Sequence, residues 1–174
     1  SSGDLYFHVN AYGAYEFDLA EGSSYDIDSV LDTPTNYTPD SGNAGGNYAT
    51  FNYLQKNGGI TLSNGNLQLQ GSGSSWKSTQ TTFAMKSGKW YCEFGPNLWK
   101  DNNNHCQLGI AGMGFGNSNE MGGTDFSAFY HYTGTKFFNG QGGAGTTFGD
   151  AWNNNTTNVV GIAFDADTRK VWFS

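Results

Sequence analysis

The sequence predicts an all-β protein of many short strands, arranged as a sandwich or a barrel. The chain has 174 residues, and its 26 glycines permit tight turns with positive φ. Aromatic residues make up 16% of the chain and supply large buried areas, whereas charged residues make up only 13%. No window repeats its apolar residues at helical spacing over three turns, so no helix is expected.

The first strands are predicted in residues 4–20. The runs LYFHV and AYEFDL lie on either side of a turn at residues 10–13, and this pattern predicts a β-hairpin. Residues 21–46 hold two of the three prolines, several Asp and the run SGNAGG, which is typical of a linker or a long wrapping loop. The sequence therefore predicts an N-terminal β-hairpin segment and linker at residues 1–44 and a β-sandwich domain at residues 45–174.

The later strands follow one another at short intervals. GGITLSNGNLQLQG predicts a second hairpin, because Asn64-Gly65 separates two alternating runs and both turn positions favour positive φ. The last stretch, NVVGIAFDADTRKVWFS, predicts two strands around a turn at residues 165–168. Other strands are predicted at residues 47–54, 74–85, 89–94, 106–114, 126–132 and 136–138, with loops at residues 98–105 and 142–155.

The strand SGKWYCEFG has side chains of two kinds. Alternation places Trp90, Cys92 and Phe94 on one face and Tyr91 and Glu93 on the other. The first set is predicted to fill the core, and Tyr91 is predicted to cover the outer face of its sheet. In the strand CQLGIAGMG, glycines mark a place where another backbone comes close.

Composition also excludes several classes of partner. The net charge is −7, and the eight basic residues are scattered, which argues against binding to nucleic acid. No apolar run is long enough to span a membrane. The three histidines and two cysteines lack the spacing of zinc ligands, so neither a metal nor a cofactor is expected.

Two acidic groupings have a structural explanation that competes with a functional one. Asp26, Asp28 and Asp32 supply oxygen ligands suited to calcium, but their spacing is not that of an EF-hand loop, and a solvated linker is favoured. Asp165 and Asp167 flank a predicted hairpin, where Asp is a usual turn residue. Neither grouping is expected to form a site.

Catalysis is not expected either. Glu120 and Asp125 are two carboxylates, as a glycosidase needs, but no E-x-D-x-E strand motif surrounds them. The run GMGFGNSNEMGG has the glycines of a phosphate-binding loop without its Lys-Ser/Thr or a following helix. The chain is therefore predicted not to be an enzyme.

Four motifs in order resemble a SPRY domain: SGKWYCE at 87–93, LGIA at 108–111, VVGIAFD at 159–165 and VWFS at 171–174. The resemblance implies a twisted antiparallel β-sandwich of the concanavalin-like, jelly-roll type, preceded here by an extended N-terminal β arm or linker. In that family the chain continues after the F-S strand. Because an apolar edge strand invites pairing, we expect Ser174 not to be a natural terminus.

The segment SVLDTPTNYTPDSGNAGGNYATFNYL resembles linkers in large virion proteins of marine phages. This implies a protein of the virion that is assembled in the host cytoplasm. The strands that carry Cys92 and Cys106 are predicted to be antiparallel neighbours, which would bring their Cβ atoms to a distance compatible with a disulfide. Two reduced buried thiols are the favoured alternative, because the cytoplasm is reducing.

Loop aromatics and amides are the predicted ligand-binding residues, since sugar rings stack on Trp and Tyr while Asn reads hydroxyls. For Tyr132 and Trp152, packing beneath their own loops is the alternative. The predicted set is Trp99, Asn102, Asn103, Tyr130, Tyr132, Trp152 and Asn154.

The resemblance implies a non-enzymatic module of a virion surface appendage, such as a tail fibre or spike. We expect it to adhere to a host-surface glycan or protein and to associate with other virion subunits as a homo-oligomer. The main alternative is a purely structural capsid or tail component whose N-terminal segment, residues 1–38, pairs with neighbouring subunits. A polysaccharide-degrading enzyme is the lesser alternative.

Overall fold

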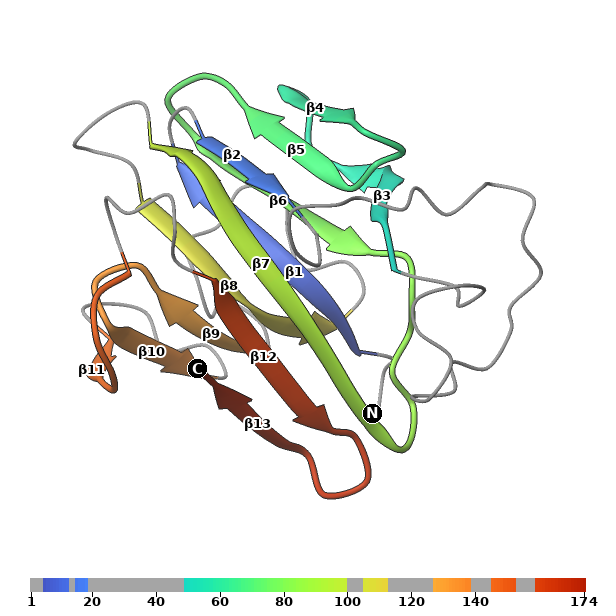
Figure 1. Ribbon diagram of the computed structural model, residues 1–174, viewed down its shortest axis with the longest axis vertical. Coiled ribbons are helices and arrows are strands. Elements are labelled where there is room, and N and C mark those ends of the chain that lie inside the picture. The colour runs from blue at the N-terminus through green and yellow to red at the C-terminus, as the bar shows by residue number, and fades with distance from the viewer. Residues whose placement is uncertain are drawn as a thin grey trace.

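The computed structural model describes residues 5–12, 15–18, 49–99, 105–112, 127–138, 145–152 and 159–174. Within these ranges the regular secondary structure consists of thirteen β-strands and no helix. The strands form two sheets in which every pair is antiparallel. Figure 1 shows the two sheets lying face to face. The predicted all-β class and antiparallel sandwich are confirmed.

The first sheet has seven strands. In spatial order they are β11 (Thr146–Thr147), β10 (Thr135–Phe138), β9 (Ser127–His131), β8 (His105–Gly112), β1 (Leu5–Tyr12), β6 (Trp76–Thr81) and β3 (Phe51–Lys56). The second sheet has six strands. In spatial order they are β13 (Lys170–Phe173), β12 (Val160–Asp165), β7 (Lys89–Trp99), β2 (Tyr15–Asp18), β5 (Gln68–Gly71) and β4 (Ile60–Ser63).

The core lies between the sheets and follows from alternation along the strands. Phe7 and Val9 of β1 point into it from the seven-stranded sheet, and Phe94 and Ile162 do so from the six-stranded sheet. Phe51 packs on Phe94 across the interface, with ring centroids 6.2 Å apart. Burial of these large side chains is the main stabilising term for the fold.

The predicted N-terminal hairpin is wrong. β1 pairs with β6 and β8 in the seven-stranded sheet, whereas β2 pairs with β5 and β7 in the six-stranded sheet. The predicted turn at residues 10–13 overlaps β1, which continues to Tyr12, and a turn signal carries no information on which sheet each strand joins. β1 is therefore an interior strand and not an extended arm. The predicted boundary near residue 45 lies outside the described residues, and strands from both sides of it build both sheets.

The hairpin around Asn64-Gly65 is confirmed, with one difference. Asn64 and Gly65 have φ of 52° and 61°, but Asn66 also has a positive φ of 65°. Ser63 pairs with Gln68, so four residues form the loop, and Leu67 lies in it, outside the strand. The amide of Leu67 donates to the carbonyl of Asn64 at 3.0 Å and closes the turn.

Cys92 and Cys106 are free thiols on different sheets. Cys92 on β7 lies opposite Ile162 of β12, and Cys106 on β8 lies opposite Ala11 of β1. The prediction that their strands are antiparallel neighbours is wrong, because β1 and β9 occupy both sides of β8. Burial raises the pKa of both thiols well above the usual range.

Candidate functional site

The structure separates the predicted loop residues into one that lies in a strand, three that lie outside the described residues, and three that pack in an aromatic cluster. Trp99 is the last residue of β7 and lies opposite Tyr15 of β2, so its backbone belongs to a sheet and not to a loop. Asn102, Asn103 and Asn154 lie outside the described residues. Their predicted role in ligand binding therefore stays a prediction.

Tyr130 and Trp152 are buried in an aromatic cluster near the edges of both sheets. The ring of Tyr130 lies 5.4 Å from that of Phe148, 6.2 Å from that of Trp152 and 5.6 Å from that of Phe173, centroid to centroid. Its hydroxyl donates to the carbonyl of Asp150, and burial raises its pKa. Rings enclosed in this way offer no free face to a ligand.

The loop at residues 145–152 packs over this cluster. The amide of Trp152 donates to the carbonyl of Tyr132 at 3.0 Å, and the half-buried Tyr132 packs against the core. For Tyr132 and Trp152, the structure thus matches the alternative in which these rings pack beneath their own loop. Tyr130 belongs to the same cluster.

Exposed aromatics gather elsewhere, on the outer face of the six-stranded sheet. Tyr91 of β7 is 60% exposed and Trp172 of β13 is 52% exposed. Tyr91 lies opposite Ala163 of β12, and Ala163 lies opposite Trp172, so the three residues form one row across neighbouring strands. Strands in a sheet are about 4.8 Å apart, which separates the two aromatic Cα atoms by roughly 10 Å. We call this row the aromatic face.

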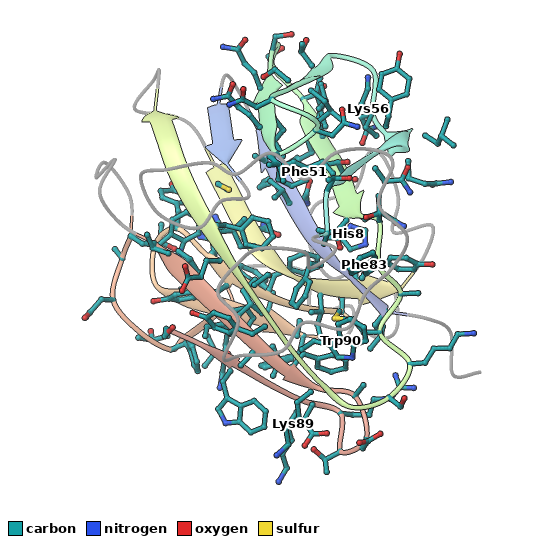
Figure 2. All side chains as sticks on the ribbon, turned by 45° about the vertical axis from the view of Figure 1, so that its right-hand side comes forward. His8, Phe51, Lys56, Phe83, Lys89 and Trp90 are labelled. Carbon is teal, nitrogen blue, oxygen red and sulfur yellow. The ribbon has the colours of Figure 1, made fainter. Side chains whose placement is uncertain are left out.

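Alternation explains why these rings face solvent. Trp90 and Cys92 on β7, and Val171 and Phe173 on β13, pack against the core, so the residues between them must point outward. Figure 2 shows Trp90 directed into the sandwich and Lys89, its neighbour in sequence, directed away from it. The predicted outward position of Tyr91 is confirmed.

Gly161 and Glu93 fix the ring of Tyr91. A Cβ atom on Gly161 would lie 2.8 Å from the hydroxyl of Tyr91, so the ring lies over this glycine. The hydroxyl donates to Oε1 of Glu93 at 2.6 Å. That hydrogen bond, with smaller contributions from burial and from the charge of Glu93, raises the pKa of Tyr91 to about 12. The ring is held in place but stays mostly exposed.

A row of charged residues borders the aromatic face. Lys89 lies opposite Asp165, and Asp165 lies opposite Lys170. Oδ1 of Asp165 accepts from the amides of Asp167 and Thr168, each at 3.0 Å. The bond from Thr168 is the main reason that the pKa of Asp165 is below its usual value. The predicted turn role of Asp165 is confirmed.

The turn before β7 is bonded to the turn between β12 and β13. The amide of Gly88 donates to Oδ1 of Asp167 at 3.1 Å, and the amide of Ala166 donates to the carbonyl of Gly88 at 2.9 Å. The indole nitrogen of Trp90 donates to the carbonyl of Ser87 at 2.8 Å. These bonds order the backbone on which Lys89 stands.

A second group of polar residues lies on the seven-stranded sheet and was not predicted. Ser78, Asn10, Gln107 and His131 form a row across β6, β1, β8 and β9, and each is buried. Among the residues that the structure describes, neither amide atom of Gln107 has a hydrogen-bond partner. Because each of these residues is buried, a ligand cannot reach this row directly. The aromatic face is therefore the stronger candidate site.

The fold and the aromatic face together define an antiparallel β-sandwich with an exposed aromatic row on one sheet. Comparison with protein-family models, with curated proteins and with solved structures gives no match to this chain. The likeness to a SPRY domain therefore stays a prediction. In the described part of the chain, no helix is long and apolar enough to cross a membrane. The same residues contain no group of three or more His, Cys, Asp or Glu that could hold a metal ion.

Proposed function

We propose that the chain is a non-enzymatic adhesion module that binds glycans through the aromatic face. The observation that carries the proposal is the row of Tyr91, Ala163 and Trp172, in which two exposed rings flank a small residue. Sugar rings present C–H faces that pack on aromatic rings, and the small side chain between the rings leaves room for a flat ligand. Exposed aromatic patches on soluble domains commonly mark binding sites.

The rigidity of the face also supports binding. Its residues stand on three hydrogen-bonded strands, and sites on strands hold their geometry better than sites on loops. The hydroxyl of Tyr91, the carboxylate of Glu93 and the hydroxyl of Ser174 lie beside Gly161, where they can bond to sugar hydroxyls. A preformed site costs less ordering entropy on binding.

The biological setting comes from the sequence resemblance. We infer that the module belongs to a virion surface appendage, of the tail fibre or spike type, that adheres to the host surface. Other virion subunits would then be its partners in a homo-oligomer, in a particle that is assembled in the host cytoplasm.

A structural role in subunit assembly is the second candidate. It is favoured by the position of Trp172 on β13, which pairs within the described residues only with β12. Edge strands pair readily with other chains, and Trp is enriched at interfaces. In this case Trp172 would contact a neighbouring subunit and not a sugar.

Binding of the protein to a panel of host-surface polysaccharides, measured by calorimetry, tests the proposal. We expect Tyr91→Ala and Trp172→Ala each to weaken binding about tenfold, as truncation of an aromatic anchor usually does. The matched control is Tyr53→Ala, because Tyr53 is 65% exposed but lies on β3 of the other sheet. Both test variants should unfold at nearly the parent temperature, since their rings are largely exposed.

Three outcomes would contradict this assignment. Binding that neither substitution weakens would remove the aromatic face as the site. Shortened polysaccharide products in the same samples would show an enzyme. A lack of glycan binding, together with a smaller sedimenting species for Trp172→Ala than for the parent, would favour the role in subunit assembly.

A further inference from the structure

We propose that the preferred ligand of the aromatic face is an acidic glycan, whose carboxylate or sulfate groups are held by Lys89 and Lys170. This inference rests on the proposed function and adds the charge class of the ligand. Its basis is the placement of two lysines on the same face as the rings, at one end of an otherwise acidic chain.

The register places the lysines next to the rings. Lys89 and Tyr91 are two residues apart on β7, and Lys170 and Trp172 are two residues apart on β13. Side chains two apart on a strand share a face and are separated by roughly 6.7 Å along it. Both lysines are exposed, so each ring has an exposed lysine two residues away on the same side of the sheet.

The charge of this end differs from that of the whole chain. The chain carries a net charge of −7, yet four of its eight basic residues lie within residues 82–89 and 165–170. These are Lys86, Lys89, Arg169 and Lys170, against two acidic residues, which gives a local formal charge of +2. An anion is therefore attracted to this end of the face and repelled by the molecule as a whole.

The two acidic residues offset part of this attraction but leave the local formal charge at +2. One oxygen of Asp165 accepts two backbone amides, and one oxygen of Asp167 accepts the amide of Gly88. These bonds hold both carboxylates to the turn. Asp165 also separates the two lysines across the row, because it lies between them on β12. An anionic group of the ligand must therefore reach the ammonium groups of Lys89 and Lys170 from the solvent side of the sheet.

The opposite end of the face has the opposite character. Glu93 accepts the hydroxyl of Tyr91 and lies in the row of Gly161, two residues beyond the rings. A carboxylate at that end repels an anion but accepts hydrogen bonds from neutral sugar hydroxyls. The charges thus orient the bound ligand on the aromatic face, with its acidic group next to Lys89 and Lys170.

Two matched pairs of polymers test the inference. Polygalacturonate is compared with its methyl ester, which has the same backbone without the charge, and dextran sulfate is compared with dextran. We expect at least one anionic polymer to bind more tightly than its neutral counterpart, and the preference to fall between 50 mM and 500 mM NaCl because salt screens exposed charges. Lys89→Gln and Lys170→Gln should each reduce the preference about threefold, and the double variant about tenfold.

The control variant is Lys136→Gln, which makes the same change in net charge on β10 of the other sheet. It should leave the preference unchanged. If neither anionic polymer binds more tightly than its neutral counterpart, or if Lys136→Gln removes as much of the preference as Lys89→Gln does, the inference is wrong. Equal binding of charged and neutral polymers that still depends on Trp172 would overturn the inference but keep the proposed function. Charge-dependent binding unaffected by Trp172→Ala would instead overturn the assignment to the aromatic face.

Discussion

Single residues decide how the aromatic face presents its rings. Tyr91 keeps its position because Gly161 has no side chain and because Glu93 accepts its hydroxyl. Trp172 needs no such partner, since β13 alternates between apolar residues that pack inward and residues that face solvent. The two rings therefore reach the same surface for different reasons.

The bond from Tyr91 to Glu93 can be measured by titration. The neutral phenol donates to the carboxylate, and the phenolate would be repelled by it, so the pKa of Tyr91 is raised to about 12. We expect Glu93→Gln to lower this pKa toward the ordinary value for tyrosine, followed by the ultraviolet absorbance of the phenolate. The Tyr91→Phe variant identifies the signal by its loss. An unchanged titration of Tyr91 in Glu93→Gln would show that the bond is not formed in solution.

At the scale of elements, one glycine sets the distance between two strands. A Cβ atom on Gly109 of β8 would lie 2.0 Å from the carbonyl oxygen of Ala128 and 2.8 Å from the ring of Phe129, both on β9. The close backbone that the glycines of this strand predict is thus confirmed at Gly109. β9 can pair with β8 at this position only because the side chain is missing.

Substitution of this glycine should separate the two strands. We expect Gly109→Ala to lower the free energy of unfolding by about 3 kcal/mol or more, because a backbone atom must move to admit the methyl group. Gly112→Ala, in the same strand, is the control, since a Cβ atom there would meet no atom of the described residues within 4 Å. Denaturant unfolding of both variants measures the difference. Equal stabilities would contradict the close approach of β9.

Elements whose partners are near in sequence were predictable, and elements with distant partners were not. The β4–β5 hairpin and the β12–β13 turn depend on their own Asn, Gly and Asp residues, and the pattern of β7 depends on alternation alone. The partners of β1 lie far along the chain, and no local rule selects them. Alternation, a local rule, placed Tyr91 on the outer face of its sheet. The position of Trp172 in the same row depends on the pairing of β7 with β12, two strands that are far apart in sequence, and nothing in the sequence indicated it.

The loop residues predicted to bind a ligand show the same limit. Tyr130 and Trp152 have the composition of a binding loop, yet Trp152 packs on Tyr130, and Tyr130 packs on Phe173, which comes from the edge strand of the other sheet. An aromatic ring in a polar segment can serve as a ligand platform or as packing beneath that segment. Only the position of the distant strand decides between the two.

At the scale of the whole molecule, stability depends on a neutral histidine on β1, an interior strand of the seven-stranded sheet. Burial lowers the pKa of His8 to about 3, whereas in the unfolded chain it is near 6.5. Between these values the unfolded chain binds the proton and the folded protein does not. The free energy of unfolding must therefore fall as the pH falls from about 6.5 toward 3.

We expect His8 to lower the free energy of unfolding by about 1.4 kcal/mol for each pH unit that the pH falls between about 6.5 and 3. His8→Gln should flatten the dependence by that amount, whatever its stability at neutral pH, because glutamine does not titrate. Denaturant unfolding of both proteins between pH 7 and pH 4 provides the comparison, since the carboxylates titrate alike in both. If the free energy of unfolding depended on pH equally in both proteins, His8 would have the same pKa in the folded and the unfolded chain.

The interior position of β1 has a consequence for the order of folding. His8 pairs with Gln80 on one side and with Gly109 on the other, 72 and 101 residues later in the chain. The strand β1 is thus synthesised well before either of its partner strands, β6 and β8. Sheets closed by such distant pairs fold slowly. During that delay an alternating apolar strand stays unprotected, and this makes nascent chains the stage at which the protein is most prone to aggregate.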